Sequence, residues 1–129
     1  MAARIFLALS ALVWLPYGVW CFIDPAQLAG SAGVAFQSAT GSTELRAMYG
    51  GLQAGLGALA LADVLRLAFE RPALLALLFV TAGLASARLA GVALDGSPSS
   101  YTLAGLGFEI ATVAFSGWLL ARAPFEPAH

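Results

Sequence analysis

Four long apolar stretches constrain the fold of this chain more than any other feature. They cover residues 3–23, 43–69, 72–94 and 100–123. Each is about 20 residues long, which is the length that an α-helix needs to cross a bilayer. A backbone that faces lipid must satisfy its own hydrogen bonds, and helices of this length do so. The sequence therefore predicts an all-α fold, a bundle of four transmembrane helices.

The composition agrees with a membrane location. Of the 129 residues, 60% are hydrophobic and only 10% are charged, whereas soluble domains usually carry about 25% charged residues. A water-soluble core of this size could not cover so much apolar surface. We therefore expect residues 1–129 to form a single integral membrane domain whose surplus apolar surface faces the lipid bilayer.

The first apolar stretch resembles a secretory signal but lacks its cleavage site. Arg4 precedes the stretch, and no small-residue cleavage motif follows it. The bulky Trp20 directly before Cys21 also argues against lipoprotein processing. We expect this segment to be retained as the first span.

The connection between the first two spans is about 20 residues long, far longer than the other two. Asp24 followed by Pro25 is typical of an N-cap and a first helical turn. The apolar residues Leu28, Val34 and Phe36 then predict a short interfacial helix that lies on the membrane surface.

The charged residues predict the orientation. Four arginines fall on one side of the predicted hairpins, and three acidic residues fall on the other. The arginines are Arg4, Arg66, Arg71 and Arg122, and the acids are Asp24, Glu44 and Asp95. Because positive charge is retained in the cytoplasm, both termini are expected to be cytoplasmic, with the first and third connections outside.

Each predicted span has one polar or small face, since its polar residues recur at spacings of three, four and seven. The four faces are Ser10, Trp14, Tyr17, Cys21 and Asp24; Arg46, Tyr49, Gly50, Gln53 and Gly57; Thr81, Ala85, Arg88, Gly91 and Asp95; and Thr102, Gly105, Glu109, Thr112 and Ser116. The apolar remainder of each helix suits lipid, so the polar faces are expected to meet inside the bundle.

Two ionisable residues are predicted to lie deep in the membrane. A charge at the centre of a span costs about 3 kcal/mol on insertion scales, so Arg88 and Glu109 are expected to pair with each other. With Arg46, Tyr49 and Gln53 they form the predicted ligand-binding residues of a polar pocket open to the outer side. The alternative is that the Arg88–Glu109 pair is a structural clamp that fixes helix register.

Small residues predict close helix packing. Gly51 and Gly55 form a G-x-x-x-G, and small residues recur every four positions from Gly83 to Gly91. Such faces let helices approach closely, either within the bundle or at a homodimer seam. Asp63 and Arg66 are expected to pair at the membrane interface, since residues three apart on a helix are neighbours.

Several functional classes are disfavoured by what the sequence lacks. It has no lysine and a net charge of -1, which gives no basic face for nucleic acid. One cysteine and a single histidine, the final His129, argue against cysteine or histidine metal sites and imidazole catalysis. We predict no catalytic and no metal site. No cofactor is indicated, and proton transfer by Glu109 is the only enzymatic chemistry that the residues suggest.

One segment carries a family resemblance. "ELRAMYGGLQAGLG", which starts at Glu44, contains the pattern E-x-R-x-x-Y-G-G, and it is followed by Arg88, by "LDG" at 94–96 and by Glu109. The chain thereby resembles the family called domain of unknown function 4345. The resemblance implies a small four-helix protein of the bacterial inner membrane and carries no established activity. More distantly, the layout is similar to that of DoxX-like proteins, some of which are linked to quinone redox systems.

These observations lead to three functional hypotheses. The first is a binding protein that holds a small amphipathic or lipid-like ligand, with Arg46 and Arg88 on an anionic or carbonyl head group. The second is an accessory subunit of a larger membrane complex or a homo-oligomer, which the small size and glycine-rich faces favour. The third, and least favoured, is a quinone-linked redox partner.

Overall fold

The computed structural model describes residues 1–66, 69–96 and 98–122, and all secondary structure in this part of the chain is helical. The elements are α1 (Ala2–Ile23), α2 (Gln27–Ala32), α3 (Ala39–Leu45), η1 (Arg46–Gly51), α4 (Leu52–Arg66), α5 (Glu70–Asp95) and α6 (Ser100–Arg122). The elements α3, η1 and α4 follow one another without a break and together form one 28-residue span. Within the described residues, four helices are long and apolar enough to cross a membrane, as predicted.

Two of the spans begin earlier than predicted. The second begins at Ala39 because Ser38 acts as its N-cap, its hydroxyl accepting a hydrogen bond from the Gly41 amide at 3.1 Å. The third begins at Glu70, so Pro72 lies within the first turn, where a missing N–H leaves no hydrogen bond unmade. Because proline cannot continue a helix, Pro124 and Pro127 are expected to end the fourth span; both lie outside the described residues.

The first connection contains the short helix α2, but its start was wrongly predicted. The Asp24 carboxylate accepts a hydrogen bond from the Ala26 amide at 3.2 Å and closes a turn, while α2 begins only at Gln27. Leu28 is fully buried within α2. Val34 and Phe36 follow the helix instead of belonging to it, because Gly33 ends it in the left-handed conformation.

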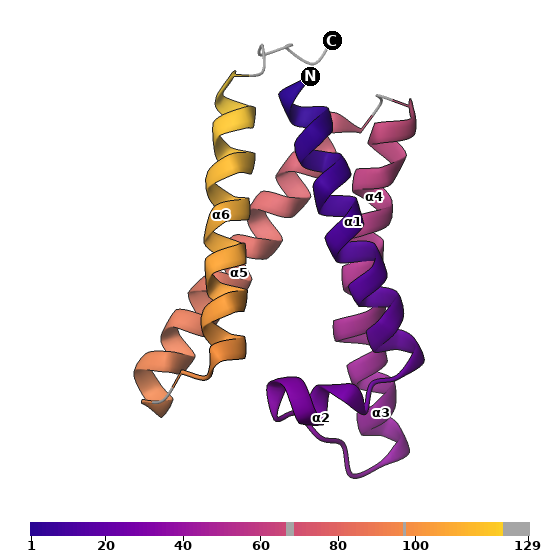
Figure 1. The fold of residues 1–129 in the computed structure, drawn as a ribbon, viewed down its shortest axis with the longest axis vertical. Helices are drawn as coiled ribbons and strands as arrows, with labels where there is room; N and C mark the ends of the chain where they lie inside the picture. Colours follow the sequence, from indigo (N-terminus) through magenta and orange to yellow (C-terminus); the bar gives the residue numbers. More distant parts are fainter. Residues whose placement is uncertain (67–68, 97, 123–129) are drawn as a thin grey trace.

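The spans form two pairs. Helix α1 packs along η1 and α4, and α5 packs along α6. Figure 1 shows that the pairs meet at the end that carries the N-terminus and diverge toward the opposite end. We call the first the terminal end, where Ala2, Arg66, Glu70 and Arg122 lie, and the second the loop end. Helix α2 lies at the loop end and contacts α6.

The apolar core lies mainly in the terminal half of the bundle. It is formed by Ala3, Leu7, Ala11, Trp14, Leu56, Ala60, Ala73, Leu74, Leu77 and Leu119. All four spans contribute, so this cluster joins the two pairs. Large apolar side chains such as Ile5, Leu12, Phe79 and Phe115 are exposed on the outside, as expected for surfaces that face lipid.

The close packing of α1 against the second span depends on Gly18 and on Gly57, which lies on the predicted inward face of the second span, and not on the G-x-x-x-G. A Cβ added to Gly18 would lie 2.8 Å from Ala54 Cα, and one added to Gly57 would lie 2.7 Å from Leu15 Cβ. Gly55, by contrast, has no atom within 4 Å of the corresponding point. The expectation that the G-x-x-x-G packs inside the bundle is therefore wrong. Successive residues of a helix point about 100° apart, so Gly55 faces another direction than Gly57.

The expected pairing of Asp63 with Arg66 is also wrong. Asp63 is fully buried, and its carboxylate accepts a hydrogen bond from the Phe69 amide at 2.8 Å. Phe69 is the N-cap residue of α5, whose first amides have no partner within the helix. The carboxylate thus holds the end of α4 against the beginning of α5, in place of a surface ion pair.

Candidate functional site

A cavity of about 160 Å³ lies between the two helix pairs, on the loop side of the core. All four spans contribute to its wall, which consists of Val13, Trp14, Tyr17, Gln53, Leu84, Arg88, Tyr101, Phe108 and Glu109. A second cavity, also of about 160 Å³, shares Trp14, Gln53, Leu84 and Arg88 with the first. The predicted convergence of polar faces therefore places several polar groups in the wall of an open space whose lining is otherwise mainly apolar.

The wall formed by α6 holds the guanidinium of Arg88. Tyr101, Gly105 and Glu109 are spaced four residues apart, so they lie on one face of α6. The Arg88 Nε donates to Glu109 Oε1 at 2.8 Å, and its Cζ lies 5.8 Å from the centroid of the Tyr101 ring. A Cβ at Gly105 would lie 3.2 Å from Arg88 Cζ. The absence of a side chain at Gly105 gives the guanidinium its room.

The predicted pairing of Arg88 with Glu109 is confirmed. Glu109 is only 3% exposed, whereas the Arg88 side chain is 26% exposed. Removing one partner of a buried pair leaves an uncompensated charge, so each residue depends on the other. The second carboxylate oxygen, Glu109 Oε2, is buried and makes no hydrogen bond with any residue that the structure describes.

Aromatic side chains from α1 complete the wall. The hydroxyls of Tyr17 and Tyr101 lie 2.8 Å apart, which is a hydrogen bond between α1 and α6. Among the described residues, it is the only hydrogen bond that joins a side chain of one pair to a side chain of the other. Trp14 is buried and packs against Phe108, with ring centroids 5.7 Å apart. Its Nε1 has no hydrogen-bond partner among the described residues.

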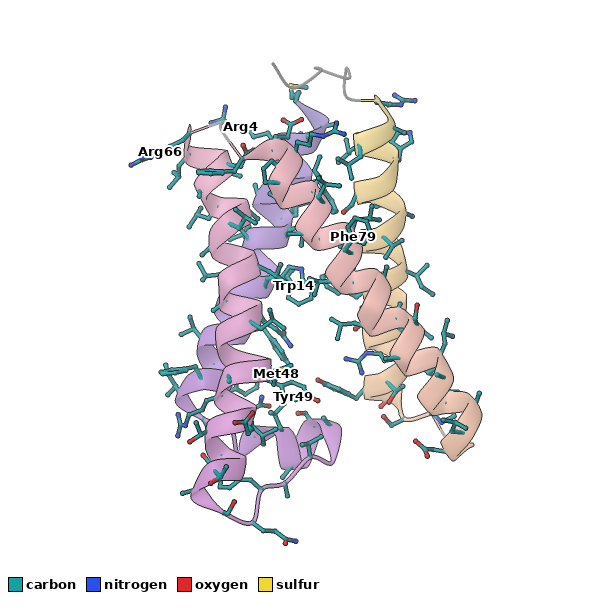
Figure 2. All side chains as sticks on the ribbon, turned by 180° about the vertical axis from the view of Figure 1, so that it is seen from behind. Arg4, Trp14, Met48, Tyr49, Arg66 and Phe79 are labelled. Carbon is teal, nitrogen blue, oxygen red and sulfur yellow. The ribbon has the colours of Figure 1, made fainter. Side chains whose placement is uncertain are left out.

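The two predicted residues of the second span that reach the cavities are Tyr49 and Gln53. Gln53 lines both cavities, and Tyr49 lines the second. Figure 2 shows Trp14 and Tyr49 on the side of their pair that faces α5. Tyr49 belongs to η1, a π-helical segment that the sequence analysis did not predict. Such segments are rare and often occur at functional sites.

Arg46 does not line either of these cavities. Its guanidinium donates to the carbonyl oxygens of Phe22 and Ile23, the latter at 3.2 Å, and lies over the Phe22 ring. These carbonyls end α1 and lack partners within the helix. The structure therefore gives Arg46 a helix-end contact, and its role in ligand binding stays a prediction from the sequence.

Three wall residues with hydrogen-bonding side chains were not among the predicted site residues. Trp14 and Tyr17 fall on the polar face of the first span, but aromatic side chains in a span are more often core or interface residues. Tyr101 lies eight residues before Glu109, on the same face of α6. This spacing is the signal that would have placed Tyr101 beside the Arg88–Glu109 pair.

The wall suits recognition by hydrogen bonding. It offers a guanidinium, a carboxylate, two hydroxyls, a carboxamide and an indole N–H. The Val13 and Phe108 side chains beside these groups are 48% and 38% exposed, so the cavity borders the apolar outside of the bundle. A bound molecule could therefore have a polar head inside and an apolar remainder between α1 and α6.

Comparison with known proteins assigns the chain to a family but not to an activity. The family model described as "Domain of unknown function (DUF4345)" matches residues 2–120. No curated protein and no solved structure matches the chain. Because the matched region runs from the start of α1 to within two residues of the end of α6 and includes every wall residue of the cavity, the chain belongs to the DUF4345 family.

Proposed function

We propose that this protein binds a small amphipathic or lipid-like molecule in the cavity between its two helix pairs. The observation that carries the proposal is the convergence of polar side chains from all four spans on one cavity wall. A clamp that only fixed helix register would need the Arg88–Glu109 pair and nothing more. Tyr17, Gln53 and Tyr101 lie around the same space without belonging to the pair.

The amphipathic character of the ligand is inferred from the border of the cavity. The polar groups lie between the pairs, whereas Val13 and Phe108 are exposed on the outside of the bundle. A molecule with an apolar tail would place that tail against these side chains and extend it into lipid. A fully polar solute would gain nothing from this border.

We further propose that the protein resides in the bacterial inner membrane with its termini in the cytoplasm. Arg4, Arg66, Arg71 and Arg122 belong to the first or last turns at the terminal end of the helices, which supports this orientation. The loop end would then face outward. Single cysteines introduced at Gly96 and at Arg122 of a Cys21→Ala background test this with an impermeant maleimide on intact spheroplasts, which should label only the first.

Ligand binding is tested by filling the cavity. Leu84 lines both cavities, so Leu84→Trp should displace a bound molecule. Leu89→Trp, on the same helix but 52% exposed, is the matched control. Native mass spectrometry should find a small molecule with the wild type and with Leu89→Trp, and none with Leu84→Trp. A wild type that carries nothing, or a molecule equally retained by Leu84→Trp, would contradict the proposal.

An accessory role in a larger complex is the second candidate function. It is favoured by uncovered small residues, since a Cβ at Gly55 or Gly83 would contact nothing within 4 Å. Small faces of this kind allow another helix to approach closely. Purification in a mild detergent should then recover a partner protein or an oligomer in constant proportion. Recovery of the monomer alone from every preparation would argue against this role.

A further inference from the structure

We infer that the head group which the cavity takes is an uncharged hydroxyl that donates to Glu109 Oε2 and accepts from Trp14 Nε1. This inference rests on the proposed binding function and specifies the chemistry of the ligand. It differs from the anionic or carbonyl head group that the sequence suggested. Three features of the wall carry it: an unsatisfied acceptor, an unsatisfied donor and the balance of charge.

The acceptor and the donor belong to the two most deeply buried polar side chains of the wall. Glu109 is 3% exposed and Trp14 is 4% exposed. Glu109 Oε2 and Trp14 Nε1 both lack a hydrogen-bond partner among the residues that the structure describes. A buried polar atom without a partner is destabilising, so most such atoms in folded proteins are hydrogen-bonded. A ligand that reached both atoms would satisfy both.

The chemistry of these two atoms selects the head group. A carboxylate oxygen only accepts hydrogen bonds, and an indole N–H only donates them. A single group that reaches both atoms must therefore donate and accept at once, and a hydroxyl does so through one oxygen atom. An ether or a ketone can accept from Trp14 but offers nothing to Glu109. An ammonium group can donate to Glu109 but offers nothing to Trp14.

The charge of the wall disfavours an anion. Arg88 and Glu109 are the charged residues that line the cavity, and they neutralise each other at 2.8 Å. Arg46, the second cation expected there, contacts the carbonyl oxygens that end α1. An anionic head group close to Glu109 Oε2 would meet a like charge with no surplus cation. An uncharged head group avoids that repulsion.

The test compares three probes that share one tail: 1-dodecanol, dodecyl methyl ether and dodecanoate. Binding to the wild type in phosphatidylcholine nanodiscs, whose lipids have no hydroxyl group, is followed by native mass spectrometry. Since hydrogen bonds to charged groups are stronger than neutral ones, the alcohol should bind about tenfold or more tightly than the ether. Dodecanoate should bind more weakly than the alcohol.

One variant and its matched control test the hydrogen bond from Trp14. Trp14→Phe removes the donor that both the alcohol and the ether use, so both should weaken while their ratio stays unchanged. Trp118→Phe, an exposed tryptophan outside this cavity, is the control and should change neither affinity. The wild-type ratio alone decides the inference if Trp14→Phe does not fold.

The outcomes separate the two proposals. Equal binding of alcohol and ether, or dodecanoate binding as tightly as the alcohol, would overturn the hydroxyl assignment while leaving amphiphile binding in place. Failure of all three probes to bind, with no molecule retained by the wild type, would overturn both the assignment and the proposed function. Preference for the alcohol by tenfold or more would support both.

Discussion

The terminal and loop ends of the bundle are built in opposite ways. At the terminal end, Leu7, Leu74 and Leu77 are buried almost completely and join the two helix pairs. Toward the loop end the pairs diverge (Figure 1). The polar residues that line the space between them include Gln53 and Arg88. The contrast teaches that the two pairs are joined at one end, which leaves the space between them at the other end free to keep polar groups for a ligand.

The two pairs also differ in how they are joined internally. Helix α1 touches the second span through glycines, with backbone against backbone at Gly18 and Gly57. Helices α5 and α6 meet near the cavity through the ion pair of Arg88 and Glu109. Backbone contact tolerates no added atom, whereas side-chain contact can adjust. The following predictions test this difference, from the largest expected effect to the smallest.

The largest effect is expected from Gly18→Ala. The new Cβ would lie 2.8 Å from Ala54 Cα and would push the two helices apart. Overpacking of this kind destabilises by about 3 kcal/mol at the upper end of its usual range. Reversible unfolding in mixed micelles should measure this loss of folding free energy. Gly55→Ala, which meets no neighbouring atom, should be neutral or slightly stabilising; equal losses in both variants would contradict the account.

Arg88→Gln is expected to have the next largest effect. It leaves the buried Glu109 carboxylate without its cation, which should destabilise the fold by about 2 kcal/mol, less than for a fully buried pair because Arg88 is partly exposed. Adding Glu109→Gln should recover part of the loss, since the double variant buries no charge. The same unfolding assay measures the stability of both variants and so completes the double-mutant cycle. A double variant less stable than Arg88→Gln would argue against direct coupling.

A smaller effect is expected from Gly105→Ala. Its Cβ would lie 3.2 Å from Arg88 Cζ, but a long side chain can move away. We expect about 1 kcal/mol of destabilisation, the lower end of the overpacking range, together with weakened ligand binding. Gly107→Ala, two residues along α6 and free of contacts, is the matched control. Unchanged ligand retention in Gly105→Ala would show that the position of the guanidinium does not matter for binding.

The smallest effect is expected from Tyr17→Phe, which removes the hydrogen bond to Tyr101. Hydrogen bonds between membrane helices average about 0.6 kcal/mol, so global stability should change little. The distance distribution between spin labels at the loop ends of α1 and α6 should broaden. A stability loss as large as that of Gly18→Ala would mean that the two pairs are also held together at the loop end.

Much of the fold could be predicted because it depends on composition and on the spacing of polar and apolar residues along each helix. Four apolar stretches specify four spans, and the polar faces identify which side of each helix points inward. The pairing of Arg88 with Glu109 could be predicted because lipid penalises each charge alone. The first connection was predicted less well, since the residues that cap α2 act through local hydrogen bonds that the apolar pattern does not reveal.

The remaining errors concern residues whose contacts depend on the direction that they face around the helix axis. Gly50 and Gly57 contact α1 while Gly51 and Gly55 do not, although the two sets differ by only one or two positions. The π-helical segment η1 changes the helical phase at this point, and no feature of the sequence predicted it. Asp63 and Arg46 reach partners on other helices, and only the tertiary arrangement brings those partners near.

The account's central claim is that the polar cavity binds a molecule while the fold is held elsewhere. It is tested most directly by measuring stability and ligand retention together on the Arg88→Gln/Glu109→Gln double variant. The account predicts a folded bundle, with an unfolding midpoint between those of Arg88→Gln and the wild type, that has lost the molecule retained by the wild type. A double variant that unfolds, or one that stays folded and keeps the molecule, would contradict it.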